Sequence, residues 1–362
     1  MAEATRSIYC FGFGPWKFGF VRAYLSPLAS RVRFCAFPLD ARLRGFDERA
    51  QLVVWGLRNI PGLEAFAARR GASIWRMEDG FLRSVGLGSD FVVPASLVLD
   101  RQGIYFDPTR PSDLETILQT SEFSPDELRR AASLRESIVS AALSKYNFAQ
   151  TRAPLARPAT DKRVLLVPGQ VEDDASIRLG CRDIRTNEGL LAQVRADHPD
   201  AYIVFKPHPD LLSENRKAGV LSVERMRELA DQVVTDHPLP ECLAIADEVH
   251  TMTSLVGFEA LLRGLPVATY GCPFYAGWGL TRDRHPVARR TRALSLDMLV
   301  VGTLIRYPLY LSRETGALTT PEVVIEELRG ELHQRGGARP PSRLGRKLRK
   351  LKHAVRGLLS GV

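Results

Sequence analysis

Three carboxylates follow a short apolar stretch near the middle of the chain and could supply acid–base or nucleophilic chemistry. The apolar stretch, Val164–Val167, is long enough for a strand buried on both faces, and Pro168-Gly169 ends it. The polar residues that come next are Gln170, Glu172, Asp173 and Asp174. Ligands of open α/β sheets bind outside the carboxyl ends of the strands, so this cluster is a candidate catalytic site. The alternative is a solvent-exposed acidic loop in which Asp174 or Ser176 caps the next helix.

A second pair of acids, Glu78-Asp79, follows another predicted strand in the first third of the chain. Gly80 and then Arg83 come after it, so carboxylates, a glycine and a cation again follow a strand. Paired carboxylates at a strand end could serve acid–base chemistry. The alternative is an ion-paired turn with no chemical role.

Residues that suit an anionic ligand follow a strand in the second half. Lys206 ends this strand, and His208 lies between Pro207 and Pro209, which hold its backbone extended. An ammonium and a fixed imidazole at a strand end could bind a phosphate. The alternative for His208 is a purely structural role.

Thr253 and Ser254 open a predicted helix, where hydroxyls, backbone N–H groups and the helix dipole bind anions. Glu259, five residues into this helix, could accept hydrogen bonds from ribose hydroxyls. Ordinary capping and a solvent-exposed Glu259 are the alternatives. Together with Lys206 and His208 these groups make a nucleotide site that needs no metal ion. The two acidic clusters would then serve a glycosyl transfer with retention, which needs a carboxylate nucleophile and a second group for proton transfer.

Short strands separated by helices must position these residues. This alternation predicts an α/β protein with two doubly wound parallel sheets, in two domains that face each other across a cleft. The expected strands are Ser7–Phe11, Arg33–Phe37, Leu52–Trp55, Ser73–Arg76, Ser96–Leu99, Arg163–Val167, Tyr202–Phe205, Glu248–Thr251 and Pro266–Tyr270. The main expected helices are Phe20–Leu28, Gly62–Arg70, Pro111–Leu118, Pro125–Leu143, Thr186–Ala196 and Leu255–Arg263.

Composition shifts suggest where the domains begin and end. Ala153–Asp161 is rich in Pro and Ala and is the best candidate linker. We therefore expect an N-terminal acceptor-side domain over 1–152 and a nucleotide-sugar-binding domain over 153–312. A helical segment over 313–338 and a basic tail over 339–362 complete the chain.

The composition is that of a soluble globular protein, with 45% apolar and 25% charged residues. There is no stretch of 18 apolar residues and no export signal, and five scattered cysteines never occur in CxxC spacing. These features predict reduced thiols, a cytoplasmic location and no zinc site. The chain also lacks a P-loop and a dinucleotide-binding fingerprint.

The net charge of +9 resides in the tail, because without residues 339–362 the chain has 42 basic and 41 acidic residues. The tail has an apolar stripe at helical spacing: Leu344, Leu348, Leu351, Val355, Leu358 and Val362. This pattern predicts an amphipathic helix on an anionic membrane surface. A helix docked on the protein and a disordered end are the alternatives. Nucleic-acid binding is disfavoured, since the tail has no aromatic residues to stack on bases.

Six sequence runs resemble the capsule-polysaccharide β-Kdo transferases of the KpsC type, where Kdo is 3-deoxy-D-manno-oct-2-ulosonic acid. The resemblance extends over about residues 7–312, and its runs are EDGFLRSVGLGSD, SLVLDRQGIYFDPTRPSDLE, VPGQVEDDASIRLGC, FKPHPD, TMTSLVGFEALLRGLPVATYG and PFYAGWGLTRDR. It implies a GT-B glycosyltransferase that moves Kdo from CMP-Kdo, with retention, to a lipid-linked acceptor. We expect this transfer to need no metal and to take place at the inner face of the cytoplasmic membrane.

The resemblance also implies residue roles. Asp174 is similar to the family's nucleophile, Glu78 is the candidate acid or base with Asp79 beside it, and His208-Pro209 would hold the CMP phosphate. Ser254 and Glu259 match the helix start and the carboxylate expected near the ribose. Family members usually carry two catalytic modules, and this chain resembles the second, so a partner transferase could supply the alternate linkage. The competing function is a non-catalytic capsule export or scaffold protein of the same fold.

Overall fold

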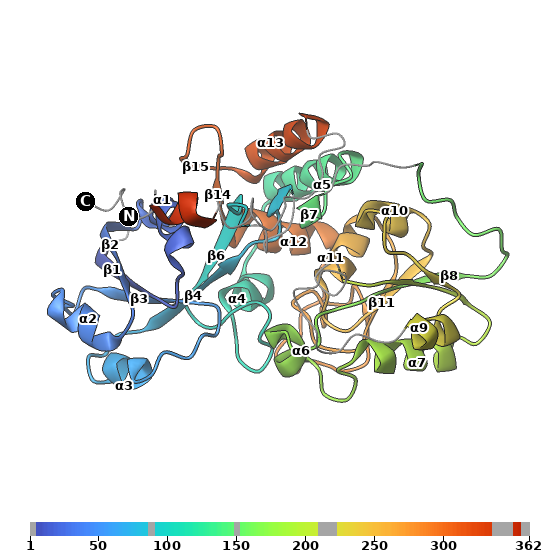
Figure 1. Ribbon diagram of the computed structural model, residues 1–362, viewed down its shortest axis with the longest axis horizontal. Helices are drawn as coiled ribbons and strands as arrows, with labels where there is room; N and C mark the ends of the chain where they lie inside the picture. The colour runs from blue at the N-terminus through green and yellow to red at the C-terminus, as the bar shows by residue number, and fades with distance from the viewer. Residues whose placement is uncertain (1–4, 86–90, 148–152, 209–222, 335–349, 356–362) are drawn as a thin grey trace. The chain divides into compact units, whose positions relative to one another are not determined.

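The computed structural model describes residues 5–85, 91–147, 153–208, 223–334 and 350–355. The chain divides into two compact units (Figure 1). Unit 1 consists of Met1–Ile104, Lys145–Phe148 and Thr303–Val362, and unit 2 consists of Tyr105–Ser144 and Ala149–Gly302. Each unit has its own main sheet, as the sequence predicts.

The unit 1 sheet has seven strands in the order β15-β14-β6-β4-β3-β1-β2. The first four strands along the chain are parallel, so their carboxyl ends share one edge. The strands are β1 (Thr5–Phe11), β2 (Ala29–Cys35), β3 (Gln51–Trp55), β4 (Ile74–Asp79), β6 (Ser96–Asp100), β14 (Pro308–Leu311) and β15 (Leu318–Thr319). A separate parallel pair joins β5 (Ser84–Val85) to β7 (Tyr146–Asn147).

One expectation for this sheet is wrong, because it is not parallel throughout. β6 runs antiparallel to β4, β14 antiparallel to β6, and β15 antiparallel to β14. Parallel neighbours need a long crossover, usually a helix, whereas antiparallel neighbours need only a short connection. No helix lies between β4 and β6 in the described part of that segment, so the chain returns antiparallel.

Alternating side chains of the unit 1 strands build two cores, one on each face of the sheet. Ile8, Cys10 and Val53 pack under α1 (Phe18–Leu25). Tyr9, Phe11, Leu52 and Val54 pack on the other face with residues of α2 (Pro38–Leu43) and α3 (Leu63–Ala68). Helices on both faces make the parallel part of this sheet doubly wound.

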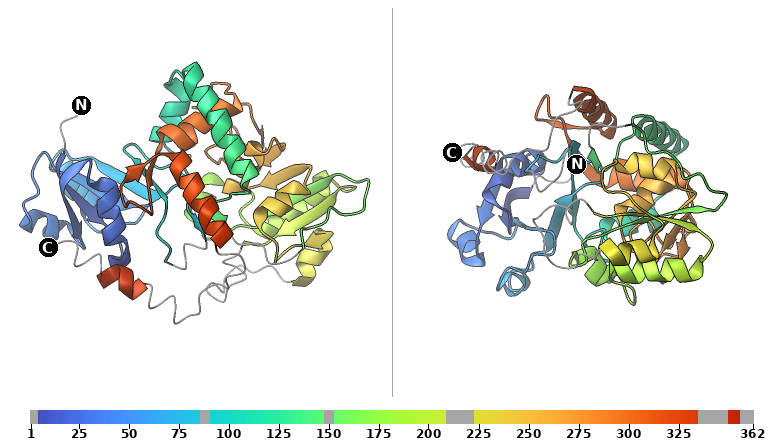
Figure 2. Two further views of the ribbon diagram at one scale, coloured as in Figure 1. Left: turned by 90° about the horizontal axis from the view of Figure 1, so that it is seen from above. Right: turned by 45° about the vertical axis from the view of Figure 1, so that its right-hand side comes forward.

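The unit 2 sheet is parallel throughout, in the order β10-β9-β8-β11-β12-β13. Figure 2 shows helices on both of its faces. The strands are β8 (Val164–Pro168), β9 (Tyr202–Lys206), β10 (Gln232–Val233), β11 (Glu248–Thr251), β12 (Val267–Thr269) and β13 (Arg282–Asp283). The helices between them are α6 (Ala175–Gly180), α7 (Asn187–Asp197), α9 (Val223–Leu229), α10 (Leu239–Ala244) and α11 (Leu255–Leu262).

The units differ from the expected domain boundaries at two places. Helices α4 (Asp113–Thr120) and α5 (Pro125–Ser140) precede residue 152 yet belong to unit 2. Ion pairs hold them there: Glu115 with Arg289 at 2.7 Å, and Arg135 with Asp297 of α12 (Leu296–Val300) at 3.5 Å. Beyond residue 302 the chain returns to unit 1, because β14 extends its sheet and α13 (Pro321–Gln334) follows.

Candidate active site

Glu78 and Asp79 lie at the carboxyl end of β4 and form the centre of a charged cluster in unit 1. The Asp79 backbone N–H donates to Glu78 Oε1 at 3.0 Å. The buried Arg83 side chain donates from Nε to Asp79 Oδ2 at 2.6 Å. Glu78 Oε2 lies only 2.8 Å from the position that a Cβ of Gly56 would take, and Gly56 has φ +54°, so another residue there would strain the backbone and displace this carboxylate. The sequence alternative of an ion-paired turn therefore holds for Asp79.

Lys17 joins this cluster and was not expected from the sequence. It ends a short 3-10 helix, Pro15–Lys17, and its ammonium lies 2.7 Å from the centroid of the Trp55 ring. Burial lowers the Lys17 pKa to about 8 against the opposing effect of Asp79 and Glu78. The sequence feature that could have identified Lys17 is its position inside the aromatic stretch that follows the first strand.

The two neighbouring carboxyls have different acidities. Burial first, and then Asp79, raise the Glu78 pKa to about 7, although Lys17 opposes the shift. Burial alone would raise the Asp79 pKa, but Arg83, Lys17 and Lys145 outweigh it and hold the pKa below its usual value. A pair of carboxyls with separated pKa values provides one proton-transfer group and one permanently ionised partner.

In unit 2, the polar residues after β9, β8 and β11 come from three adjacent parallel strands, as predicted. Gln170 links two of these strand ends. Its Nε2 donates to Thr253 Oγ1 at 3.0 Å, and its Oε1 accepts from the Thr253 backbone N–H at 2.9 Å. The Gln170 backbone N–H donates to Asn187 Oδ1 at 2.8 Å, which adds the start of α7 to the same network.

The acidic residues after β8 form hydrogen bonds with different helices. Glu172 accepts from Asn187 through the backbone N–H at 2.7 Å and Nδ2 at 3.1 Å, so it fixes the start of α7. Asp174 is exposed and is the N-cap of α6, where it accepts from the Ser176 backbone N–H at 2.9 Å and from Ser176 Oγ at 2.8 Å. Asp173 is exposed as well. The capping alternative is confirmed for Asp174, and the same bonds hold its carboxylate in one orientation.

Asp174 is connected to the Thr253-Ser254 helix start through Ser176, because Thr253 Oγ1 donates to Ser176 Oγ at 3.3 Å. Two glycines make room for the Thr253 methyl group. A Cβ at Gly180 would come within 2.9 Å of Thr253 Cγ2, and one at Gly271 within 2.7 Å. The structure therefore brings Gln170, Asp174 and Thr253 into one polar network.

The α11 residues occupy the expected element. Ser254 is the N-cap of α11, and its Oγ accepts from the Val256 backbone N–H at 3.2 Å. Glu259 is 6% exposed, so the alternative of a solvent-exposed surface glutamate is wrong. Its element is apolar almost throughout, and α11 packs on β11 and β12 with all but its first turn buried.

At the end of β9, the Lys206 side chain differs from expectation because it forms a hydrogen bond within unit 2. Lys206 Nζ donates to the His237 backbone carbonyl at 2.7 Å, and burial lowers the Lys206 pKa. One of its donors is therefore used inside unit 2. His208 follows at the strand end, where its backbone nitrogen lies 3.1 Å from the position of a Gly169 Cβ. Pro209 lies outside the described residues.

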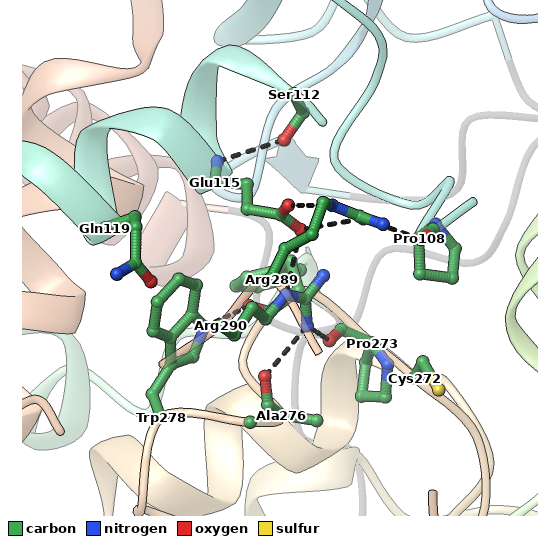
Figure 3. A network of polar contacts seen from close by, with 12 residues as sticks. Pro108, Ser112, Glu115, Gln119, Cys272, Pro273, Ala276, Trp278, Arg289 and Arg290 are labelled. Carbon is green, nitrogen blue, oxygen red and sulfur yellow. Dashed lines mark hydrogen bonds and ion pairs between the residues drawn. The ribbon is translucent and has the colours of Figure 1, made fainter. Parts of the chain in front are cut away.

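A buried ion-pair network holds the glycine-rich and aromatic loop after β12 (Figure 3). Arg290 donates from Nε to Glu115 Oε2 at 3.0 Å and from Nη1 to the Pro273 and Ala276 carbonyls at 2.5 and 2.8 Å. Tyr275, in the same loop, donates its hydroxyl to the Ser254 carbonyl at 2.5 Å. The network therefore supports the start of α11, a role that the sequence did not indicate.

Two doubly wound α/β units with polar residues at the carboxyl ends of their strands define a GT-B-like protein. The chain belongs to the family described as capsule polysaccharide biosynthesis protein, whose model matches residues 50–312. It is 42% identical over 353 residues to the capsule polysaccharide modification protein LipA of Neisseria meningitidis serogroup B, covering 96% of this chain and 49% of LipA. The chain thus spans about half the length of that relative. The lipopolysaccharide-processing protein LpsZ of Rhizobium meliloti is 40% identical, with 90% of this chain and 75% of LpsZ covered.

Two solved structures from Thermosulfurimonas dismutans KpsC are similar over 90% of this chain. The β-Kdo 2,7 transferase has a TM-score of 0.72 and 37% identity, with 99% of its chain covered. The β-Kdo 2,4 transferase has a TM-score of 0.77 and 29% identity, with 98% covered.

The described residues lack two kinds of feature. They contain no group of three or more His, Cys, Asp or Glu side chains arranged to hold a metal ion. Nor do they contain a helix whose length and apolarity would let it cross a membrane.

Proposed function

We propose that this chain is a retaining β-Kdo transferase that moves Kdo from CMP-Kdo to a Kdo-terminated, lipid-linked acceptor during synthesis of the capsule linker. The observation that carries the proposal is the similarity of nine-tenths of the chain to two β-Kdo transferases at 29% and 37% identity. Because the chain spans half of LipA, the proposal concerns one catalytic module. A second Kdo transferase would supply the alternate linkage.

The proposed reaction has two displacements at C2 of Kdo. The Asp174 carboxylate attacks C2, the bond from C2 to the phosphate oxygen breaks, and CMP leaves with the electron pair. The acceptor hydroxyl then attacks C2, its proton passes to Glu78, and the bond between Asp174 and C2 breaks. Two inversions restore the original anomeric configuration.

Glu78 suits the base role, because the CMP leaving group is a phosphate monoester and departs as an anion without needing a proton. The proton to be removed is that of the acceptor hydroxyl. A Glu78 pKa of about 7 lies near the operating pH, where a general base is most effective. The ion pair with Arg83 keeps Asp79 ionised, and the Asp79 charge helps to keep the Glu78 pKa raised.

The nucleotide would bind at the strand ends of unit 2. We assign the phosphate to His208 with Pro209 and to the Thr253-Ser254 helix start, Lys206 to the electrostatic attraction, and Glu259 to the ribose. No metal ion takes part in this scheme, so transfer should persist in EDTA. The soluble donor and lipid-linked acceptor would meet at the inner face of the cytoplasmic membrane.

The linkage is proposed to be β-(2→7). The 37% identity to the 2,7 transferase exceeds the 29% identity to the 2,4 transferase, although the TM-scores rank them in the opposite order. Identity is the better guide here, because side chains rather than the backbone course select the acceptor hydroxyl.

The test is to incubate the protein with CMP-Kdo and a short Kdo-terminated acceptor and to measure the product by mass spectrometry. We expect an added mass of one Kdo with the native chain and none with Asp174→Asn. No product from the native chain, on acceptors that a known β-Kdo transferase extends, would leave the scaffold function as the better description.

A further inference from the structure

Three large apolar side chains are exposed within one short stretch of unit 1. Phe37, Leu39 and Leu43 are 60%, 59% and 77% exposed, and we call them the α2 patch. The other large apolar side chains exposed in the described residues are scattered over four elements: Val139, Leu318, Val323, Leu351 and Val355. Three exposed large apolar side chains within seven residues favour an interaction surface, whereas single exposed apolar residues are normal.

The exposure does not come from a detached helix. Ala41, on the opposite side of α2, is fully buried and packs in the core that includes Leu52, Leu63 and Phe66. The Tyr9 hydroxyl, in the adjacent strand β1, donates to the Arg44 carbonyl at 3.0 Å just beyond the helix end. The α2 patch is therefore held outward by a well-anchored element.

Arginines accompany the α2 patch. Arg42 and Arg44 directly flank Leu43, and Arg31 lies on the adjoining edge strand β2; all three are exposed. The Asp40 carboxylate accepts from the backbone N–H groups of Ala36 and Phe37 at 2.9 and 3.3 Å, so its charge is partly offset within the turn. Residues 31–49 hold five arginines against three acids, which leaves a net charge of +2.

The α2 patch follows the same edge of the unit 1 sheet that carries Glu78. β2, β1, β3 and β4 are parallel neighbours, so the carboxyl ends of β2 and β4 lie on one edge of the sheet. The α2 patch follows β2, and Glu78 lies near the end of β4. Three strand spacings separate the two ends, roughly 14 Å.

We propose that the α2 patch is a membrane-contact surface, separate from the basic tail, that inserts Phe37, Leu39 and Leu43 into the headgroup region of an anionic bilayer. The flanking arginines would lie near lipid phosphates, as in other interfacial helices. A bilayer is the occupant that matches both features, since it offers apolar depth and negative charge over the same few ångströms. In the proposed transferase the surface would put the glycan of a lipid-linked acceptor beside Glu78.

The test is sedimentation of the full-length chain with vesicles of phosphatidylglycerol and phosphatidylethanolamine. Leu39→Ser/Leu43→Ser should lower the bound fraction about tenfold or more, whereas Val323→Ser, an exposed apolar residue on α13, should leave it unchanged. Arg42→Gln/Arg44→Gln should weaken binding to these vesicles but not to neutral phosphatidylcholine. Both substitutions affect exposed side chains, and circular dichroism would verify the fold.

Equal vesicle binding by the native chain and Leu39→Ser/Leu43→Ser would overturn the proposal. A loss of self-association in this variant, measured by light scattering, with vesicle binding unchanged would assign the α2 patch to a second copy of the chain instead. Because vesicle binding requires no sugar transfer, the result is independent of the proposed activity. Transfer to a short soluble acceptor, measured on the same variant, tests that activity separately.

Discussion

At the scale of single residues, Glu78 and Asp79 show how position separates two chemically similar side chains. Arg83 binds Asp79 directly, so Asp79 stays ionised. Burial and the neighbouring Asp79 charge raise the pKa of Glu78 to about 7. The family resemblance singled out Glu78, but the sequence could not show that the two pKa values separate, because the separation depends on burial and on the ion pair between Arg83 and Asp79.

Glu78→Gln should lower the rate of transfer by roughly 10²–10⁴-fold, the usual contribution of a general base. In the native chain kcat/KM should rise as the pH increases through about 7, since the active form is the carboxylate. The variant should lose this rise. A native rate that falls through the same range would make Glu78 an acid, and a variant with native activity would remove it from the mechanism.

Asp174→Asn should abolish transfer while CMP still binds. Asn is as good an N-cap as Asp, so the α6 start is kept and only the nucleophile is lost. Asp173→Asn, which changes an exposed neighbouring acid, is the matched control and should retain activity. If Asp174→Asn keeps more than a few per cent of the native rate, the nucleophile must be Asp173 or Glu172.

His208→Ala should weaken the binding of CMP and CMP-Kdo. A hydrogen bond to a charged group contributes about 1.5–3 kcal/mol, which corresponds to roughly ten- to hundred-fold in affinity. His333→Ala, an exposed histidine on α13, is the control. An unchanged CMP affinity of His208→Ala in calorimetry would restore the structural role for this residue.

At the scale of secondary structure, local signals predicted most elements well. Helices α4 and α5, which Ser112 and Ser124 cap, lie where two helices were predicted, and β11 has the predicted bounds. The antiparallel direction of β6 was missed, because periodicity reports which face a residue occupies and not the direction of the chain. The sequence also did not assign α4 to the second unit, because that assignment depends on the ion pair between Glu115 and the distant Arg290.

Arg290→Met should lower the free energy of unfolding by about 3 kcal/mol, because Glu115 would stay buried with one arginine partner fewer. It should also weaken CMP binding, since the loop that carries Tyr275 supports the Ser254 backbone. Arg329→Met, an exposed residue on α13, should change stability by no more than about 0.5 kcal/mol. Equal urea midpoints for the two variants would show that the network in Figure 3 does not stabilise unit 2.

At the scale of the whole molecule, most of the excess positive charge lies in the tail, residues 339–362. This distribution favours binding to an extended anionic surface over binding of a small anionic ligand. In the described part of the tail, residues 350–355 are helical, and Leu351 and Val355 are 61% and 45% exposed. The Lys350 ammonium lies 5.3 Å from the Phe91 ring centroid. The rest of the predicted tail helix lies outside the described residues.

Removing residues 339–362 should lower binding to anionic vesicles and leave transfer to a short soluble acceptor intact. Each basic residue near an anionic surface contributes about 1 kcal/mol, and salt screens the attraction. The loss should therefore be largest at low ionic strength. Equal sedimentation of truncated and full-length protein at low salt would show that the tail is not a membrane anchor.

The central claim is that this chain transfers Kdo with retention, and the anomeric configuration of the product tests it most directly. The chain is incubated with CMP-Kdo and a Kdo-terminated acceptor, and the new linkage is assigned by NMR. We predict a β-linked Kdo at O7 of the acceptor residue, formed equally with and without EDTA. An α-linked product would contradict the double displacement and, with it, the assignment of Asp174 as nucleophile.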